Sequence, residues 1–218
     1  MDYSFIANIL EKMIPAVPET LCITLIPFAV SLVLAVGITM AMYFEVPVLK
    51  DVCKVYVSFF RGTPLIGQLF LIYYGIPRLI PPLMAMSNVQ AFIVTMSLHT
   101  ASYVSEVLRG ALLSVPKGQI EASKSIGLSS FYMMRNIVLP QAVPVAIPAL
   151  VNTLIDTIKG SSIAFTIGVM DITAVAKVQA GITYQYFEAY VALVLLYWAI
   201  VLLLEFIQRR YESKIKNW

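Results

Sequence analysis

Long apolar stretches alternate with short polar segments along this chain. Residues 21–44 carry no charged side chain, and as an α-helix they would reach roughly 36 Å, because each residue adds about 1.5 Å. The hydrocarbon core of a bilayer is about 30 Å thick, so such a helix crosses it with a tilt. The pattern predicts an all-α, polytopic membrane protein with five transmembrane helices in one domain covering residues 1–218. The other four predicted spans are 55–77, 83–108, 137–158 and 187–207.

The composition is consistent with a surface that faces lipid. Hydrophobic residues make up 60% of the chain and charged residues 12%, about half the charged fraction of an ordinary soluble domain. The net charge of +3 is small and the basic residues are dispersed, which argues against nucleic-acid binding. Cys22 and Cys53 have neither metal-ligand spacing nor a disulfide pattern, so we expect no metal site. Residues 21–44 lack the basic flank and cleavage site of a secretory signal.

The basic residues divide unequally between the two sides of the predicted bundle. Eleven fall in segments that would share one side, three (Lys12, Arg78 and Lys177) fall on the other, and Lys159 lies at or inside the membrane. Cytoplasmic loops are enriched in Lys and Arg, so the larger set marks the cytoplasm. With five spans, the C-terminus is then cytoplasmic and the N-terminus outside. The larger set is Lys50, Lys54, Arg61, Arg109, Lys117, Lys124, Arg135, Arg209, Arg210, Lys214 and Lys216.

Polar side chains inside the third and fourth spans follow helical spacing. They recur at i, i+3, i+4 and i+7 in the third span and at i, i+4 and i+7 in the fourth, so each set occupies one helix face. Ionisable groups are costly inside a membrane and are therefore candidate sites for a transported solute. Two such faces on neighbouring helices could line a path for a zwitterion. The sets are His99, Ser102, Tyr103 and Glu106, and Asn152, Asp156 and Lys159.

The two polar helix faces suggest roles for individual side chains. Glu106 is the expected partner of an ammonium group, and Lys159 or nearby hydroxyls that of a carboxylate. We expect Gly160 to break the helix, so that Ser161 and Ser162 face a cavity. Alternatively, the two polar faces only hold neighbouring helices together, or the acidic residues Glu106 and Asp156 pair with Lys159 and do not contact a solute.

A polar interruption, Arg61 to Pro64, lies near the cytoplasmic end of the second span. Arg61, Thr63 and Pro64 could form a gate or an interface. The plainer interpretation is an arginine whose head group reaches the interface beside a proline kink.

Residues 114–136 form a polar connection between the third and fourth spans. Its first part, 117–126, predicts a short helix that Gly127 ends, because glycine readily adopts the left-handed conformation that follows a helix. Ser129 or Ser130 then caps the next helix. The short helix is too short to span a bilayer and too polar to enter it. It suits either docking into a groove of a cytoplasmic partner or an ordinary connection.

Several blocks of the sequence resemble permease subunits of bacterial ABC importers, in the expected order and over nearly the whole chain. Residues 116–123, with Gly127 and 137–142, resemble their Glu-Ala-Ala loop, although Ser123 stands where many have a second alanine. Residues of the second and third spans are similar to those of the polar amino acid permeases. These further matching blocks are 60–75, 102–119, 159–163 and 166–169.

The resemblance implies a type I ABC importer in the bacterial cytoplasmic membrane, working by alternating access. Two such permeases, identical or homologous, form the pore, each docks one subunit of a cytosolic ATPase dimer, and an extracytoplasmic amino-acid-binding protein delivers the solute. The sequence has no G-x-x-x-x-G-K-[ST] phosphate loop, so we expect ATP and Mg²⁺ on the ATPase and a non-catalytic translocation subunit here. The implied docking residues are Lys117, Gly118, Glu121, Ala122, Ser123, Gly127 and Pro140.

Substrate class is suggested by residues 155–168, which look most like those of cystine-type permeases. Gly160 stands where other members commonly carry an acidic residue, which favours cystine or another polar, non-basic amino acid over arginine or histidine. Two other classes fit the spans. An ion-coupled secondary transporter would work without ATP and usually shows paired repeats, which we do not find. A membrane scaffold would need no aligned polar faces.

Overall fold

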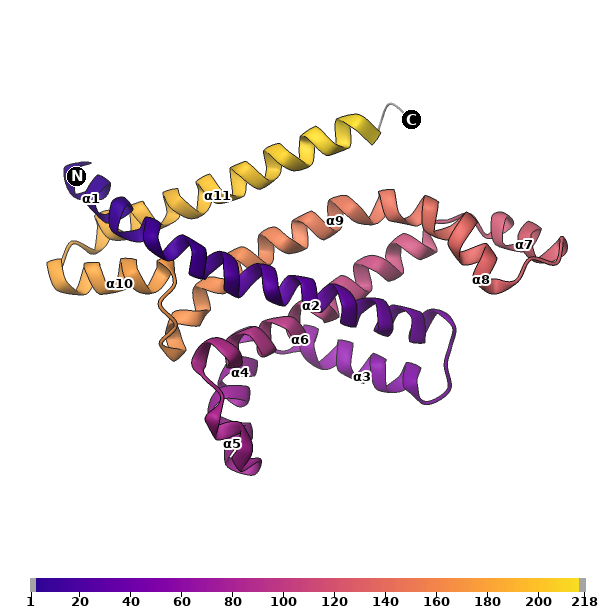
Figure 1. Cartoon of the computed structure of the whole chain (residues 1–218), viewed down its shortest axis with the longest axis horizontal. Coiled ribbons are helices and arrows are strands. Elements are labelled where there is room, and N and C mark those ends of the chain that lie inside the picture. The colour runs from indigo at the N-terminus through magenta and orange to yellow at the C-terminus, as the bar shows by residue number, and fades with distance from the viewer. Residues whose placement is uncertain (1–2, 216–218) are drawn as a thin grey trace.

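The central part of the structure is an elongated bundle of helices. The computed structural model describes residues 3–215, with side chains through Arg210, and all its regular elements are helical, which confirms the all-α prediction. Three long helices run along the bundle: α2 (Val17–Tyr43), α6 (Asn88–Leu113) and α9 (Leu139–Gly160) (Figure 1). Because α6 packs against both α2 and α9, it is the central helix.

Shorter elements gather at the two ends of the bundle. At one end, α1 (Tyr3–Met13) and α10 (Ile172–Thr183) pack against the first turns of α11 (Tyr186–Ile215). At the other end lie α7 (Lys117–Ser125) and α8 (Ser130–Met133) (Figure 1). Each end has its own buried apolar cluster, and a third cluster joins α2 to α6 between them.

The first predicted span is part of a longer helical stretch. The 3₁₀ turn η1 (Ile14–Ala16) joins α1 to α2, so the helical path runs over Tyr3–Tyr43. A tight turn follows, in which Glu45 and Val48 have φ angles of 51° and 66°. The chain then reverses into α3 (Leu49–Gly62).

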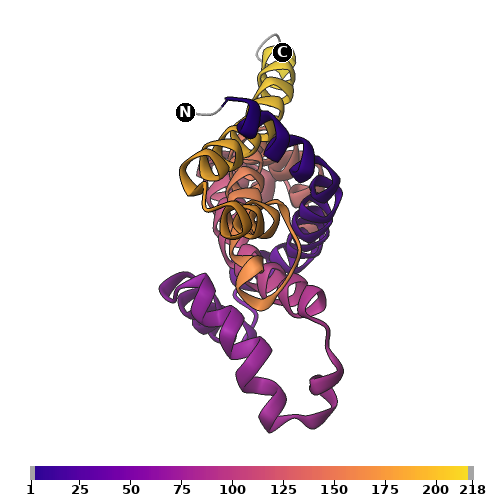
Figure 2. The ribbon, with the colours of Figure 1, turned by 90° about the vertical axis from the view of Figure 1, so that its left-hand side faces the viewer.

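The second predicted span, 55–77, is not one straight helix. The helical segments before and after Thr63 and Pro64 meet at 110°. Proline disfavours helical backbone at the residue before it, and Thr63 is indeed extended, with φ −122° and ψ 148°. Figure 2 shows this segment projecting from the bundle. After the bend come α4 (Leu65–Phe70), the π turn η2 (Leu71–Gly75), α5 (Ile76–Leu79) and the 3₁₀ turn η3 (Pro81–Ala85).

The third and fourth predicted spans have different boundaries in the structure. α6 starts at Asn88 rather than 83, because Ser87 and Gln90 form a capping box, and it continues to Leu113. The fourth helical path covers Ser130–Ile167 rather than 137–158. It consists of α8, the π turn η4 (Met134–Val138), α9 and the 3₁₀ helix η5 (Ser161–Ile167).

Three helices in the described part of the chain are long and apolar enough to cross a membrane, or four if the bent pair counts as one span. α6 is long enough, with 26 residues, but is not among them. Many of its polar side chains, such as Thr95 and Ser105, are buried against neighbouring helices, so the bundle can shield them from lipid. The five-span count therefore remains a prediction.

Candidate functional site

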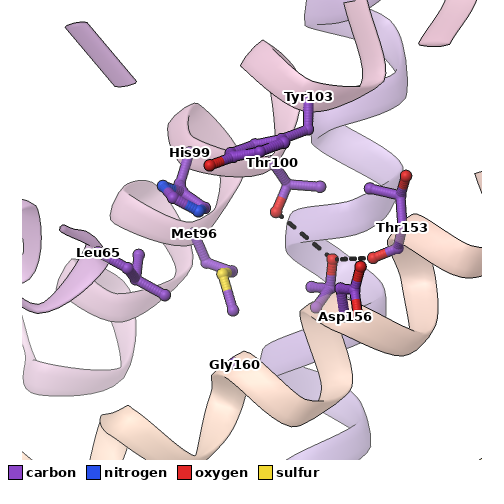
Figure 3. Close-up of a pocket in the computed structure, with 9 residues that line it drawn as sticks. Leu65, Met96, His99, Thr100, Tyr103, Thr153, Asp156 and Gly160 are labelled. Atoms are coloured by element: carbon purple, nitrogen blue, oxygen red, sulfur yellow. Dashed lines mark hydrogen bonds between the residues drawn. The ribbon is translucent and has the colours of Figure 1, made fainter. Parts of the chain in front are cut away.

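A cavity of about 290 Å³ lies between α6, α9 and the start of α4 (Figure 3). Each long helix supplies residues at i, i+3, i+4 and i+7, which is one helical face. Leu65 of α4 completes the lining. The α6 wall is Met96, His99, Thr100 and Tyr103, and the α9 wall is Thr153, Asp156, Thr157 and Gly160.

The threonines of the α9 wall present oxygen lone pairs. Thr153 donates its hydroxyl hydrogen to the carbonyl oxygen of Ala149 at 2.9 Å, and Thr157 donates to that of Thr153 at 2.8 Å. A hydroxyl has one hydrogen, so each oxygen can act only as an acceptor toward further groups, and that of Thr157 already accepts from Thr100. Thr100 Oγ1 lies 3.5 Å from Thr157 Oγ1 and joins the two walls (Figure 3).

Asp156 brings a carboxylate to the lining. Its Oδ1 lies 2.7 Å from Lys159 Nζ, one helical turn on, and both side chains are more than half exposed. Lys159 is not part of the lining. The cavity lining therefore contains one carboxylate, that of Asp156, and the cation that pairs with it, Lys159, lies outside the lining.

The aromatic residues of the α6 wall lie against each other. The His99 and Tyr103 ring centroids are 5.0 Å apart, and the Arg61 guanidinium lies 5.6 Å from the centroid of the Tyr103 ring. Arg61, Thr63 and Pro64, predicted as a gate or interface, are all at the bend beside this cavity. The bend is therefore in contact with the predicted pathway.

Glu106 lies one turn beyond Tyr103 and is held by two arginines. Its carboxylate accepts two hydrogen bonds from Arg109, at 3.0 and 2.8 Å, and lies 3.4 Å from Arg61. It is absent from the cavity lining. The structure thus places Glu106 in an ionic cluster between α3 and α6, and the expectation that it faces an ammonium in the cavity does not hold.

Other predicted pathway residues also lie outside the cavity lining. Asn152 is exposed on α9. Ser161 is fully buried, and the Ser161 hydroxyl donates to the carbonyl oxygen of Ile158. Ser162 donates to that of Lys159. The expected helix break does not open the backbone, because η5 continues directly from Gly160 and the Ser161 N–H remains bonded within the helix. This corrects the expectation for both serines.

The predicted short helix is present as α7, ending at Ser125. Gly127 has a φ of +76°, as predicted for the residue that ends it, and Ser129 caps α8 by accepting a hydrogen bond from the N–H of Tyr132. Among the predicted docking residues, Ser123 faces inward, being 2% exposed. The exposed ones are Lys117, Gly118, Glu121, Ala122, Gly127 and Pro140.

Comparison with known proteins identifies the family. The family model described as "binding-protein-dependent transport system inner membrane component" matches residues 33–217. The chain belongs to this family. It is therefore an ABC permease, an inner-membrane protein with apolar helices. Members of this family work with a binding protein and an ATPase.

Relatives and solved structures cover almost all of the permease. It is 37% identical over 99% of its length to the probable amino-acid ABC transporter permease protein PatM of Vibrio harveyi, covering 97% of that protein. It is 36% identical over 100% of its length to the L-cystine transport system permease protein TcyL of Bacillus subtilis, covering 94%. The crystal structure of an amino acid ABC transporter with histidines has a TM-score of 0.90 at 28% identity, over 98% of the permease and 99% of that chain. The resemblance to amino acid ABC importer permeases is confirmed.

Sequence reasoning about this permease missed several cavity residues. Thr100, Thr153 and Thr157 line the cavity, yet threonine is common in membrane helices and gives no ionic signal. Their spacing, at i+4 in the α6 wall and at i and i+4 in the α9 wall, is compatible with these faces but does not single them out, because the facing direction depends on how α6 and α9 pack.

Proposed function

We propose that this permease imports a polar amino acid, with cystine favoured, by alternating access driven by ATP hydrolysis on a separate subunit. The observation that carries the proposal is the near full-length similarity to amino-acid ABC permeases such as PatM. The cavity between α6 and α9 supports it, because oxygen acceptors and a balanced carboxylate there suit a small polar solute.

The preference for a non-basic solute is supported by charge. Gly160 is part of the cavity lining, so this wall has no second carboxylate there, and Asp156 is already balanced by Lys159. With Asp156 bound to the α-ammonium group of the solute, a cationic side chain of the solute would have no further acidic group in the lining. The relatives include both the cystine permease TcyL and the arginine permease ArtQ of Bacillus subtilis. Overall similarity therefore does not separate these substrates, and the preference rests on the local charge.

The predicted docking residues form the proposed contact with a cytosolic ATPase dimer. α7 lies at one end of the bundle (Figure 1), and the apolar side chains of Ile126 and Phe131 beside it are 75% and 73% exposed. Such a surface suits a groove on a partner. ATP and Mg²⁺ would bind the ATPase rather than this non-catalytic subunit. A second permease copy, identical or homologous, would complete the pore, and an amino-acid-binding protein would meet it outside.

The distribution of basic residues supports placing α7 in the cytoplasm. Lys117 and Lys124 of α7 are at the same end of the bundle as the turn before α3 (Figure 1), which Lys50 follows. Lys12 and Lys177 are at the opposite end. This orientation places the N-terminus outside and the C-terminus inside. Of the basic residues predicted to be cytoplasmic, Lys216 lies outside the described residues.

Reconstitution tests this function. The permease is placed in liposomes with its ATPase and binding protein, and uptake of labelled cystine is measured with and without ATP. We expect ATP-dependent uptake that excess unlabelled cystine inhibits more strongly than excess arginine. Stronger inhibition by arginine would contradict the cystine assignment. Uptake that follows an ion gradient without ATP would favour a secondary transporter, and no uptake of any amino acid would favour a scaffold.

A further inference from the structure

Gln68 lies behind the cavity, where α3 turns into α4. Gln68 is only 3% exposed, although it belongs to a short helix on a segment that projects from the bundle. Its carboxamide contacts the backbone of the bend on one side and His99 of α6 on the other. It is therefore the polar link between the bend and the cavity wall.

The orientation of this amide follows from its neighbours. Gln68 Nε2 lies 2.9 Å from the carbonyl oxygen of Phe60 and 3.1 Å from that of Thr63. Carbonyl oxygens only accept, so the amide nitrogen must face them. The Thr63 hydroxyl donates to the carbonyl oxygen of Phe59 at 2.8 Å and therefore also accepts from Gln68, at 2.8 Å. The amide oxygen is thereby directed to His99.

This orientation decides which ring nitrogen of His99 carries a hydrogen. Gln68 Oε1 lies 3.0 Å from His99 Nδ1, and an amide oxygen can only accept, so Nδ1 is the donor. A neutral imidazole carries one hydrogen, which leaves Nε2 with a lone pair. No carboxylate forms an ion pair with His99 among the described residues, and Asp156 across the cavity is paired with Lys159.

We propose that Gln68 is a positioning residue of the solute site: it holds His99 with hydrogen on Nδ1, and so presents Nε2 to the cavity as a hydrogen-bond acceptor. His99 is in the lining (Figure 3). Together with the oxygens of Thr153 and Thr157 and the carboxylate of Asp156, this makes a surface with four acceptors beside the hydroxyl of Tyr103. Such a surface binds the donor end of a solute, an ammonium group, rather than its carboxylate. The solute's identity rests on the proposed function, whereas the state of His99 does not.

The state of His99 can be measured directly, because it is the only histidine in the sequence. The permease is labelled with ¹⁵N-histidine, purified by a tag without histidine, and assembled with unlabelled partners in lipid nanodiscs. The two ring nitrogens give distinct ¹⁵N shifts when protonated and unprotonated. We expect a protonated Nδ1 and an unprotonated Nε2 at neutral pH. A spectrum with hydrogen on Nε2 alone, or on both nitrogens, would overturn the proposal.

Variants separate positioning from a merely structural role. Gln68→Leu removes the acceptor and should move hydrogen to Nε2. Gln68→Glu should leave it on Nδ1, because the buried carboxyl must carry a hydrogen to donate to the carbonyl oxygens of Phe60 and Thr63 and still accepts from His99 with its other oxygen. Gln141→Leu is the matched control, since among the described residues this amide donates to the carbonyl oxygen of Ile137, within its own helical turn. An unchanged spectrum in Gln68→Leu would contradict the proposal, and the wild-type spectrum tests it even if Gln68→Leu does not fold.

Transport gives the second measurement. In the reconstituted importer, Gln68→Leu should raise the half-saturating solute concentration about ten-fold, because Nε2 becomes a donor facing an ammonium, and Gln68→Glu and Gln141→Leu should not. An unchanged value in Gln68→Leu, with hydrogen on His99 Nε2, would show that Nε2 does not contact the solute. If the wild type imports no amino acid while His99 has the expected tautomer, the proposed function fails and the assignment of Gln68 and His99 stands.

Discussion

Glu106 shows how a membrane helix can hold a charge without a solute. Its side chain is 22% exposed and receives two hydrogen bonds from Arg109 and an ionic contact from Arg61. The two arginines lie on different helices, so the carboxylate joins the end of α3 to α6. Removing its charge would leave two cationic groups close together without their shared partner.

We therefore expect Glu106→Gln to destabilise the protein. Both arginine side chains are more than 40% exposed, so the cost should be modest, about 0.5–1 kcal/mol, which lowers the melting temperature by roughly 1–4 °C for a chain of this size. Thermal unfolding of the detergent-solubilised permease measures this. Glu205→Gln is the control, because Glu205 makes one exposed pair with Arg209 on α11. Equal shifts in the two variants would contradict a special role for Glu106.

Asp156 is the acidic group that reaches the cavity, and Asp156→Asn tests its contact with the solute. A charge-assisted hydrogen bond to an ammonium contributes about 1.5–3 kcal/mol, so losing it should raise the half-saturating concentration for uptake at least roughly ten-fold. Asp51→Asn removes a comparable pair, with Lys54 on α3, away from the cavity, and should leave uptake unchanged. Similar values for Asp156→Asn and wild type would exclude this contact.

Helical spacing and chemistry together led from the sequence to some residues of the cavity lining. His99 and Tyr103 were predicted to face a pathway, and both line the cavity. Because pathway residues were chosen for their polarity, Glu106 and Asn152 were also predicted to line the pathway, and both lie outside the cavity lining. The actual walls start at Met96 and Thr153, and the sequence gives no reason to prefer these faces, because their direction depends on how α6 and α9 pack.

At the scale of elements, prolines are the main source of irregularity. Each of the two π turns, η2 and η4, ends two residues before a proline, Pro77 or Pro140. Proline has no N–H and crowds the carbonyl four residues earlier, so a wider turn accommodates it. The sequence showed an interruption of the helix at Pro64 but not the size of the bend there, 110°. A proline gives the same sequence pattern whether the helix is slightly kinked or turns sharply.

α10 was missed because it is short and only moderately apolar. Asp171 caps it by accepting a hydrogen bond from the Ala174 N–H at 2.8 Å, and its other carboxylate oxygen lies 3.4 Å from the Tyr197 hydroxyl. A capping aspartate before an apolar run was the available signal. Asp171 is fully buried, so the network depends on it.

Asp171→Ala should accordingly cost about 1–3 kcal/mol, because it removes the cap and leaves buried donors without acceptors. The expected fall in melting temperature is roughly 2–12 °C. Asp171→Asn, which keeps an acceptor oxygen, should lose less. Thermal unfolding distinguishes them, and a loss in Asp171→Asn as large as that in Asp171→Ala would show that the cap is not the stabilising feature.

At the scale of the whole molecule, the two ends of the bundle should face different compartments. After replacing Cys22 and Cys53 by serine, single cysteines are introduced at Ile126, beside α7, and at Ile182 of α10, which are 75% and 67% exposed. A membrane-impermeant maleimide applied to intact cells should label the cysteine at 182 and not the one at 126. The reverse labelling would place α7 outside and contradict docking to a cytosolic ATPase.

We propose that α7 transmits ATP hydrolysis on the ATPase to the cavity, and a substitution at Gly127 tests this coupling. An added Cβ at this position meets no atom within 4 Å, so Gly127→Ala strains only the left-handed backbone, φ +76°, by about 1–2 kcal/mol. Gly181→Ala, in α10, also meets no atom and has no such φ. The measurement is ATP-driven amino acid uptake by the reconstituted importer. We predict roughly ten-fold slower uptake for Gly127→Ala and wild-type uptake for Gly181→Ala. Equal uptake by both variants, or uptake that continues when the ATPase is omitted, would show that α7 does not couple ATP hydrolysis to transport.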